Sequence, residues 1–243
     1  MCYKFEIDNT NYQDYSSGRV LYNQHGTTAF PVRLASEIFQ RCNKILREKG
    51  LHENYSIYDP CCGGTYLLTS IGFLHGKHIS EIYASDINKN VITLAKKNLS
   101  LLSISGLNKR IEQIYAMIHD FGKDSHFEAL ESSSKLMNII CNRNNMIKTE
   151  CFVEDITDCY NENLSGINIV ISDLPYGNMV SWENNKNNND SINKLLDNLL
   201  PKLSSNSVVA LITKKKVPIN HCSYIRLERF TIGKRQITIL SPR

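Results

Sequence analysis

The stretch that decides the fold is YDPCCGGTY, residues 58–66. It follows a short apolar segment and precedes an apolar helical pattern, and two glycines, Gly63 and Gly64, lie between them. Because glycine has no Cβ, the backbone can turn tightly here and bring its N–H groups close to a ligand at a helix start. Asp59, at the end of the predicted strand, would face the crevice where open α/β sheets bind ligands. The pattern indicates a nucleotide-binding turn, with a plain loop between two core elements as the alternative.

The composition is that of an ordinary globular protein. The 243 residues fit one large α/β domain or one domain with an appended piece, and 42% are hydrophobic and 21% charged. No apolar run approaches the roughly 18 residues of a membrane span, and the first residues lack the pattern of a signal peptide. We therefore expect a cytoplasmic protein that does not engage a membrane.

Cysteine and histidine spacing argues against a metal centre. The eight cysteines contain no C-x-x-C pair, and the seven histidines form neither H-x-H nor H-E-x-x-H. We expect reduced, mostly buried cysteines and no bound metal.

Charge is distributed unevenly along the chain. Residues 151–200 hold two Lys or Arg against eight Asp or Glu, whereas residues 201–243 hold nine against one. A basic carboxyl-terminal part would suit a polyanion such as RNA, and a solvated charged face is the alternative.

Apolar periodicity predicts alternating strands and helices. The predicted strands cover residues 55–59, 79–85, 150–153, 167–171, 208–213, 225–232 and 236–240. The last two are joined by a short turn at Gly233, so they must be antiparallel. Helices are predicted at 34–49 behind Pro31, at 67–76, after a cap at Asn88, and at 192–203, and two more helical stripes between 106 and 148 indicate an insertion. The polar residues 182–190 predict a mobile flap.

Acidic residues follow four of the predicted strands. Asp86 ends the second strand, 27 residues after Asp59, where folds of this type bond the two hydroxyls of a ribose. Asp155 follows the third strand, and the fourth runs into SDLPYG, residues 172–177. Because carboxyl ends of parallel strands share one edge of a sheet, we expect these side chains to meet there.

Together, YDPCCGGTY, the acidic tips and SDLPYG resemble motifs of class I S-adenosylmethionine-dependent methyltransferases. The longer strings FPVRLASEIFQR, DPCCGGTYLLT, ASDI and GKRQ resemble AviRa-type ribosomal RNA methyltransferases. The resemblance implies a Rossmann-like α/β fold with a seven-strand, mostly parallel sheet and an antiparallel last strand. It divides the chain into an arm and helix at 1–54 and a methyltransferase domain at 55–243, with a helical insertion at about 106–148. S-adenosylmethionine is the implied cofactor, and ribosomal RNA or the large ribosomal subunit the implied partner of a monomer.

The resemblance also implies roles for individual residues. Asp59 would border the methionine part of the cofactor, Asp86 would hold its ribose, and Asp155 would flank the adenine. The full set of expected cofactor contacts is Asp59, Pro60, Cys62, Gly63, Gly64, Asp86, Ile87, Asp155 and Ile156. The expected RNA contacts are Phe30, Arg33, Trp182, Lys214, Lys215, Lys216, Lys234 and Arg235. Thr65 stands where related proteins commonly have a small residue, so the approach there is either looser or assisted by the hydroxyl.

The D-L-P-Y segment can be interpreted chemically. An exocyclic base amine attacks poorly until acceptors draw off its protons, and Asp173 with the Leu174 carbonyl can provide them. Pro175 would fix the turn, and Tyr176 would stack on an extruded base. We therefore expect methylation of a guanosine in 23S rRNA, with N2 favoured, and with resistance to an orthosomycin such as avilamycin as one outcome.

Other functions stay open from sequence alone. Similar D/N-P-P-Y turns occur in methyltransferases of DNA adenine or of protein glutamine, which usually carry a target-recognition region that is not evident here. A NAD-dependent oxidoreductase would need G-x-G-x-x-G spacing, which is absent. A noncatalytic RNA-binding protein with a relic cofactor pocket is the remaining alternative.

Overall fold

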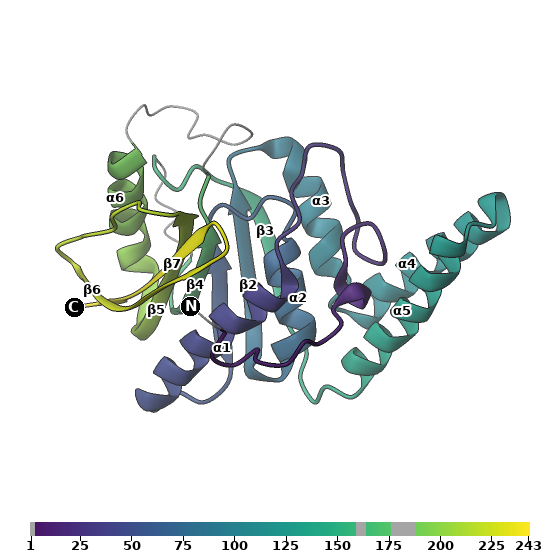
Figure 1. Ribbon diagram of the computed structural model, residues 1–243, viewed down its shortest axis with the longest axis horizontal. Helices are drawn as coiled ribbons and strands as arrows, with labels where there is room; N and C mark the ends of the chain where they lie inside the picture. Colours follow the sequence, from purple (N-terminus) through teal and green to yellow (C-terminus); the bar gives the residue numbers. More distant parts are fainter. Residues whose placement is uncertain (1–2, 159–163, 176–187) are drawn as a thin grey trace.

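Seven strands form one sheet in the order β3-β2-β1-β4-β5-β7-β6 (Figure 1). The computed structural model describes residues 3–158, 164–175 and 188–243. Strands β1 to β5 are parallel to one another, whereas β7 is antiparallel to both β5 and β6. The predicted mostly parallel sheet with an antiparallel last strand is thus confirmed. The strands are β1 (Tyr55–Asp59), β2 (Ile79–Asp86), β3 (Lys148–Val153), β4 (Ile167–Asp173), β5 (Leu203–Lys214), β6 (Tyr224–Ile232) and β7 (Arg235–Pro242).

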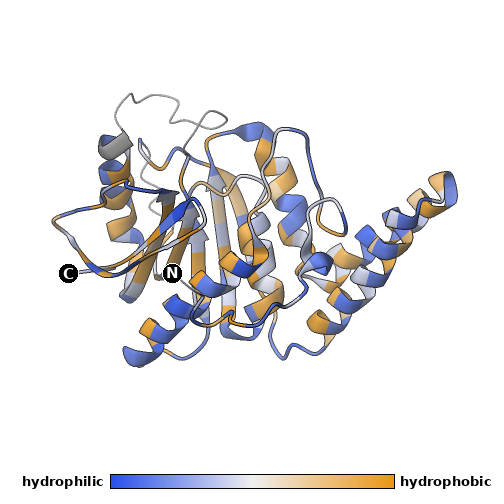
Figure 2. Ribbon diagram, in the orientation of Figure 1, coloured by the Kyte–Doolittle hydropathy of each residue, from blue (hydrophilic) through white to orange (hydrophobic). Residues whose placement is uncertain are grey.

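Helices cover both faces of this sheet. They are α1 (Val32–Glu48), α2 (Tyr66–His75), α3 (Lys89–Ser100), α4 (Ile104–Phe121), α5 (Asp124–Cys141) and α6 (Asn188–Leu199). Successive side chains of a strand point to opposite faces. Accordingly Ile57 packs in one apolar cluster with α1, α2 and α3, and its neighbour Tyr58 packs in a second cluster with α6. Figure 2 shows hydrophobic residues concentrated in the central strands and hydrophilic ones on the outer surface of α1.

The amino-terminal arm is held against α1. Pro31 is the N-cap of α1 rather than its first helical residue, and Leu34, Ile38 and Cys42 form the predicted buried stripe. Glu37 is fully buried and accepts hydrogen bonds from the backbone N–H groups of residues 4–6 and from Arg41. Burial alone would raise the pKa of Glu37, but these hydrogen bonds outweigh it and lower that pKa below its ordinary value.

The insertion consists of the two predicted helices. After α3, which Asn88 caps by accepting a hydrogen bond from the backbone of Asn90, the chain forms α4 and α5 as an antiparallel pair. The pair projects from the body of the molecule (Figure 1). Leu107 and Leu136 are buried, whereas Phe121 and Phe127, near the connecting turn, are at least half exposed.

Three predicted boundaries were wrong in α6 and β5. The predicted helix at 192–203 begins earlier, at Asn188, and its α-helical part ends at Leu199, because Pro201 has no N–H and leaves a short 3-10 turn at Leu200–Lys202. Strand β5 then starts at Leu203, five residues before the prediction. The predicted flap at 182–190 lies outside the described residues except for its last three, which open α6.

The expectation of mostly buried cysteines holds in part among the six that the structure describes. Cys42, Cys62 and Cys151 are buried, Cys61 is partly buried, and Cys141 and Cys222 are exposed.

Candidate active site

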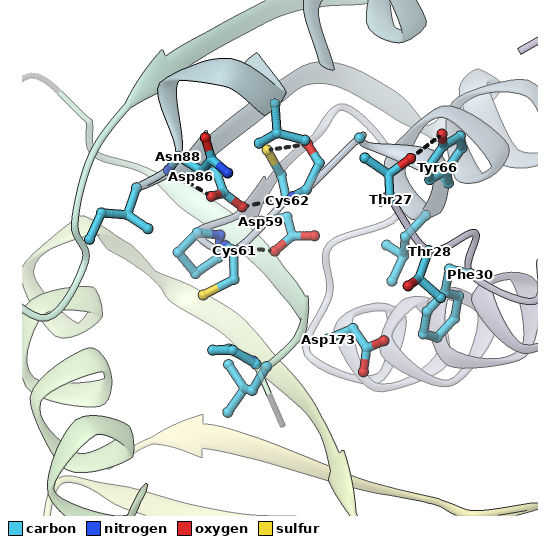
Figure 3. A pocket seen from close by; sticks show the side chains of 18 of the residues that line it. Thr27, Thr28, Phe30, Asp59, Cys61, Cys62, Tyr66, Asp86, Asn88 and Asp173 are labelled. Carbon is cyan, nitrogen blue, oxygen red and sulfur yellow. Dashed lines mark hydrogen bonds between the residues drawn. The ribbon is translucent and has the colours of Figure 1, made fainter. Parts of the chain in front are cut away.

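A cavity of about 730 Å³ opens at the carboxyl edge of the parallel strands (Figure 3). Its volume is that of a typical small-molecule site. Asp59, Asp86, Asp155 and Asp173, each from the end of a different strand, line it. The parallel sheet brings together acidic groups that are spread over more than a hundred residues of sequence.

The glycine turn and Asp86 form one hydrogen-bonded unit. The Gly63 N–H donates to Asp86 Oδ2 at 2.9 Å, and the Asn88 N–H donates to Asp86 Oδ1 at 2.9 Å. Gly63 has a φ of +50°, which disfavours any residue with a side chain. A Cβ on Gly64 would lie 2.8 Å from the Tyr66 ring, so this glycine is required by packing. The turn therefore holds the Asp86 carboxylate in place beside the cavity.

Thr65 lies behind the cavity wall. It is fully buried with a φ of +58°, and it is not part of the cavity wall. Its hydroxyl donates to the carbonyl oxygen of Ala95 at 3.2 Å and contacts that of Gly64 at 2.8 Å. The hydroxyl is used inside the fold, so of the two alternatives for Thr65 the contacts do not support assistance by the hydroxyl at the cavity.

Asp59 is suited to a cationic ligand group. Its side chain is 2% exposed, and its Oδ1 accepts hydrogen bonds from the Cys61 N–H at 3.0 Å and the Ser172 hydroxyl at 2.7 Å. Burial raises the pKa of Asp59 to about 7, although these two hydrogen bonds lower it, and Asp86 and Asp173 add to the rise. A cation at this carboxyl would stabilise its ionised form, as the ammonium of a methionine moiety would.

Two acidic residues, Glu154 and Asp155, directly follow β3 and line the cavity. Asp155 Oδ1 accepts hydrogen bonds from the backbone N–H of Thr157 at 2.9 Å and from its hydroxyl at 2.7 Å. Glu154 is buried on the cavity wall, where it accepts a hydrogen bond from the Tyr58 hydroxyl at 2.8 Å and lies 3.7 Å from Lys202 Nζ. Ile156, also on the wall, adds apolar surface beside them.

Asp173 shares its corner of the cavity with a cation and an aromatic ring. Arg235 Nε lies 3.8 Å from Asp173 Oδ2, and the Arg235 guanidinium carbon lies 5.1 Å from the centre of the Phe30 ring. Leu174 is buried and donates its N–H to the Ile212 carbonyl at 3.0 Å, which fixes the chain just after β4. Pro175 also lines the cavity. Figure 3 shows Asp173 and Phe30 on the side away from Asp86.

Most predicted site residues lie around this cavity. The wall contains all nine expected cofactor residues, and it also contains Asp173, Leu174, Pro175, Phe30 and Arg235. Tyr176 and Trp182 lie outside the described residues. The expected RNA contacts that do not line the cavity are Arg33, Lys214, Lys215, Lys216 and Lys234.

Arg33 has a structural partner in place of the expected RNA contact. Its guanidinium donates to the backbone carbonyl of Glu6 at 2.7 and 3.1 Å and to that of Ile7 at 3.0 Å, and it lies 4.2 Å from the centre of the Tyr3 ring. Arg33 therefore fastens the arm to α1. By contrast, Lys214, Lys215, Lys216 and Lys234 are exposed.

One wall was missed from sequence. Residues 24–28 of the arm line the cavity, and the Thr27 hydroxyl lies 3.0 Å from the Tyr66 hydroxyl on the same side of it (Figure 3). The arm shows no helical or strand period that would predict its position. The one hint in the sequence was Tyr66, the partner of Thr27, which is the last residue of the glycine-containing stretch 58–66. The other missed wall residues are Cys61, Leu67, Asn88, Asn90, Val91, Glu154, Thr157 and Ser191.

The sheet is Rossmann-like and has its cavity at the carboxyl edge of the parallel strands. The glycine turn is hydrogen-bonded to the carboxylate of the second strand, and the fourth strand ends in another carboxylate. These features are those of a class I S-adenosylmethionine-dependent methyltransferase. Residues 1–235 match the family model described as rRNA methyltransferase AviRa, and the chain belongs to this family. It is 32% identical to the 23S rRNA (guanine(2535)-N(1))-methyltransferase of Streptomyces viridochromogenes, over 98% of this chain and 95% of that protein.

Solved structures agree with this membership. The rRNA methyltransferase aviRa from Streptomyces viridochromogenes superposes with a TM-score of 0.86 at 31% identity, covering 98% of this chain and 96% of that one. TrmN from Thermus thermophilus, at 14% identity and a TM-score of 0.51, covers 89% of this chain and 50% of its own, and this likeness concerns the fold alone.

Family membership settles several open points. The protein is an S-adenosylmethionine-dependent RNA methyltransferase, which sets aside the oxidoreductase and the noncatalytic RNA-binding protein. The expectation of N2 as acceptor is not supported, because the relative is named for N1. Among the described residues, no helix has both the length and the apolar character to span a membrane.

Proposed function

We propose that this chain methylates N1 of a guanosine in 23S rRNA, with S-adenosylmethionine as the methyl donor. The relative named for this reaction supports the choice, since the two chains are 32% identical over nearly their whole lengths. The observation that carries the proposal is that Asp173 lines the same cavity as Asp59 and Asp86. A proton acceptor beside the cofactor carboxylates is the arrangement that methylation of a base nitrogen requires.

The acceptor chemistry follows from the properties of guanine N1. This nitrogen carries a proton and its lone pair is delocalised, so it becomes a good nucleophile only when the proton leaves. The Asp173 carboxylate is positioned to take that proton. S-adenosylmethionine, when bound, supplies a methyl group whose bond to sulfur breaks, leaving its electron pair on sulfur, as the bond to N1 forms.

The thiols beside the cavity take no covalent part in this proposal. Burial, with the nearby carboxylates, raises the pKa of Cys61 well above its ordinary value. Burial likewise raises the pKa of Cys62, with Cys151 and the carboxylates adding to the rise. A protonated thiol is a poor nucleophile, so direct transfer to the base is favoured over a cysteine-bound methyl group.

Four lysines are candidates for phosphate contacts. Lys214 ends β5 and pairs with Arg235 of β7, and the Lys215 N–H donates to the Lys234 carbonyl at 3.3 Å. Lys214, Lys215, Lys216 and Lys234 therefore lie at the same edge of the sheet as Arg235 and are exposed to solvent. Contacts of this kind position a nucleic acid without reading its bases.

Tritiated methyl transfer into 23S rRNA, DNA and protein fractions tests the proposal. We expect label in 23S rRNA, supplied as a naked transcript or in large subunits, and label confined to DNA or protein would overturn it. In the same assay Asp173→Asn should lose transfer while retaining S-adenosylmethionine binding by calorimetry. Asp86→Asn is the matched control, since the same chemical change at the cofactor carboxylate should weaken binding itself.

We further propose a biological setting. Methylation of the ribosomal target would protect the ribosome from an orthosomycin such as avilamycin. The enzyme would act in the cytoplasm, because its RNA substrate is cytoplasmic, and it would act as a monomer. Expression in a sensitive host should raise the inhibitory avilamycin concentration, whereas the Asp173→Asn variant should not. An equal effect of both proteins would argue against resistance through methylation.

A further inference from the structure

Arg235 is turned inward, unlike the lysines beside it. Its side chain is 26% exposed and lines the cavity, 3.8 Å from Asp173 and over the Phe30 ring. The Arg235 Nε is buried and has no hydrogen-bond partner among the described residues. Because buried N–H groups are nearly always paired, this donor is available to a ligand in the cavity.

A phosphate contact does not account for this placement. Lys214 and Lys234 are exposed at the edge of the sheet, where a nucleic-acid backbone can pass. Arg235 instead lies between a carboxylate and an aromatic ring inside the cavity that holds the reacting groups. The planar fork of a guanidinium is suited to hydrogen bonding with a base at such a position.

The pair Asp173 and Arg235 matches one edge of guanine. That edge presents the N1–H donor beside the O6 acceptor. A carboxylate accepts and a guanidinium donates, so Asp173 can accept from N1–H while Arg235 donates to O6. Adenine presents an acceptor at N1 and a donor at N6, which would oppose both groups.

We propose that Arg235 is a catalytic residue that donates to O6 of the target guanine and stabilises the negative charge that forms there; this inference rests on the proposed function. As the N1–H proton passes to Asp173, the electron pair of the N–H bond remains on N1 and spreads to O6. A fixed cation at O6 lowers the free energy of that charge distribution. Arg235 and Asp173 thus divide the work between charge stabilisation and proton removal.

The charges around this pair have known positions. Asp59 from β1 faces Asp173 closely enough for the two carboxylates to interact, and Arg235 faces it from β7. Lys214 is the β5 neighbour of Arg235 but is exposed. Replacing Arg235 therefore removes the cation nearest to Asp173 among the described residues that line the cavity.

The test compares Arg235→Gln and Arg235→Lys with Lys234→Gln, which removes a neighbouring charge at an exposed position. Single-turnover methylation of 23S rRNA, RNA affinity against salt, and S-adenosylhomocysteine binding are measured for each. We expect Arg235→Gln to slow turnover about 100-fold, the usual effect of losing a transition-state donor, with unchanged RNA affinity. Arg235→Lys should recover part of the rate, and Lys234→Gln, at a proposed phosphate contact, should weaken RNA binding.

The pH profile separates charge stabilisation from a structural role. Without the cation, N1 of the target guanine holds its proton more firmly. The pH–rate profile of Arg235→Gln should therefore have its midpoint at higher pH than the profile of the parent protein. The difference in rate between the two proteins should become smaller as the pH increases. An unchanged turnover rate with weaker RNA binding and a shallower salt dependence would make Arg235 a phosphate contact and overturn the inference. A slower rate with an unshifted pH profile would also overturn it.

The nucleoside produced by the parent protein distinguishes the two levels of the proposal. If the parent yields a product other than 1-methylguanosine, the proposed function fails and the inference with it. If the parent yields 1-methylguanosine and Arg235→Gln keeps its rate, the inference alone fails. Retained S-adenosylhomocysteine binding shows that a variant is folded. If Arg235→Gln does not fold, the rate and pH profile of Arg235→Lys are compared with those of the parent protein instead.

Discussion

The pKa of Asp59 predicts a proton release when the cofactor binds. In the empty protein this carboxyl has a pKa of about 7, raised by burial, and a cationic amino group beside it would favour the ionised form. If the complex holds Asp59 fully ionised, the affinity should increase about fivefold from pH 6 to pH 7, with about 0.9 proton released at pH 6 and about 0.5 at pH 7. The sign follows from the raised pKa, since the proton that must leave is bound more fully at low pH.

Calorimetry with S-adenosylhomocysteine in buffers of different ionisation enthalpy measures this release directly. Both pH values lie below the roughly 7.7–8.0 at which an α-amino group loses its proton, so the ligand stays cationic. Asp59→Asn should abolish this contribution. Ser172→Ala removes a hydrogen bond that lowers the pKa of Asp59, so its midpoint should move to higher pH. Equal proton release by the parent and Asp59→Asn would refute the reasoning.

Three further predictions concern the cavity and the arm. Asp86→Asn should weaken S-adenosylhomocysteine binding at least tenfold by calorimetry, about 1.4 kcal/mol, because it removes a carboxylate from the cavity wall; unchanged affinity would exclude Asp86 from the site. Gly64→Ala should cost about 1–3 kcal/mol in urea unfolding, since its Cβ would overlap the Tyr66 ring; no loss would contradict the packing role. Glu37→Gln should cost about 3 kcal/mol and loosen residues 4–6 in hydrogen exchange; unaltered exchange there would contradict its role as the anchor of the arm.

The strands and their tips were predictable because the signals are local. Strand β1 is buried along its whole length, and β4 is aliphatic because helices cover both faces. Because β1, β2 and β4 are parallel, the residues at their carboxyl ends, including Asp86 of β2 and Asp173 of β4, must share one edge of the sheet. The glycine turn was predictable for the same reason, since few residue types tolerate its backbone conformation.

The arm and the direction of individual basic side chains were not predictable. Residues 24–28 line the cavity next to Tyr22, whose backbone exchanges hydrogen bonds with the Asn98 side chain 76 residues further along the chain, and no periodicity reports such a contact. Arg33 and Arg235 have the same side chain, and both were predicted to contact RNA. In the structure Arg33 binds the backbone of the arm, whereas Arg235 enters the cavity. Lys202, counted in the basic tail, is buried near Glu154. Such outcomes depend on tertiary partners rather than on spacing.

The basic tail is therefore not one uniform surface. Of its nine cations, Lys202 is buried and Arg235 enters the cavity, while Lys214 to Lys216 and Lys234 are exposed near the same edge of the sheet. The concentration of positive charge in residues 201–243 predicted a polyanionic partner, but these side chains lie in at least three different environments. The Arg235 and Lys234 variants separate the cavity cation from an exposed one.

The central claim is tested most directly by identifying the methylated nucleoside. After reaction of the purified protein with S-adenosylmethionine and unmodified 23S rRNA, the RNA is digested to nucleosides and analysed by mass spectrometry against authentic standards. The account predicts 1-methylguanosine, formed by the parent protein and absent with Asp173→Asn. N2-methylguanosine, a methylated adenosine, or equal 1-methylguanosine with the Asp173→Asn variant would contradict it.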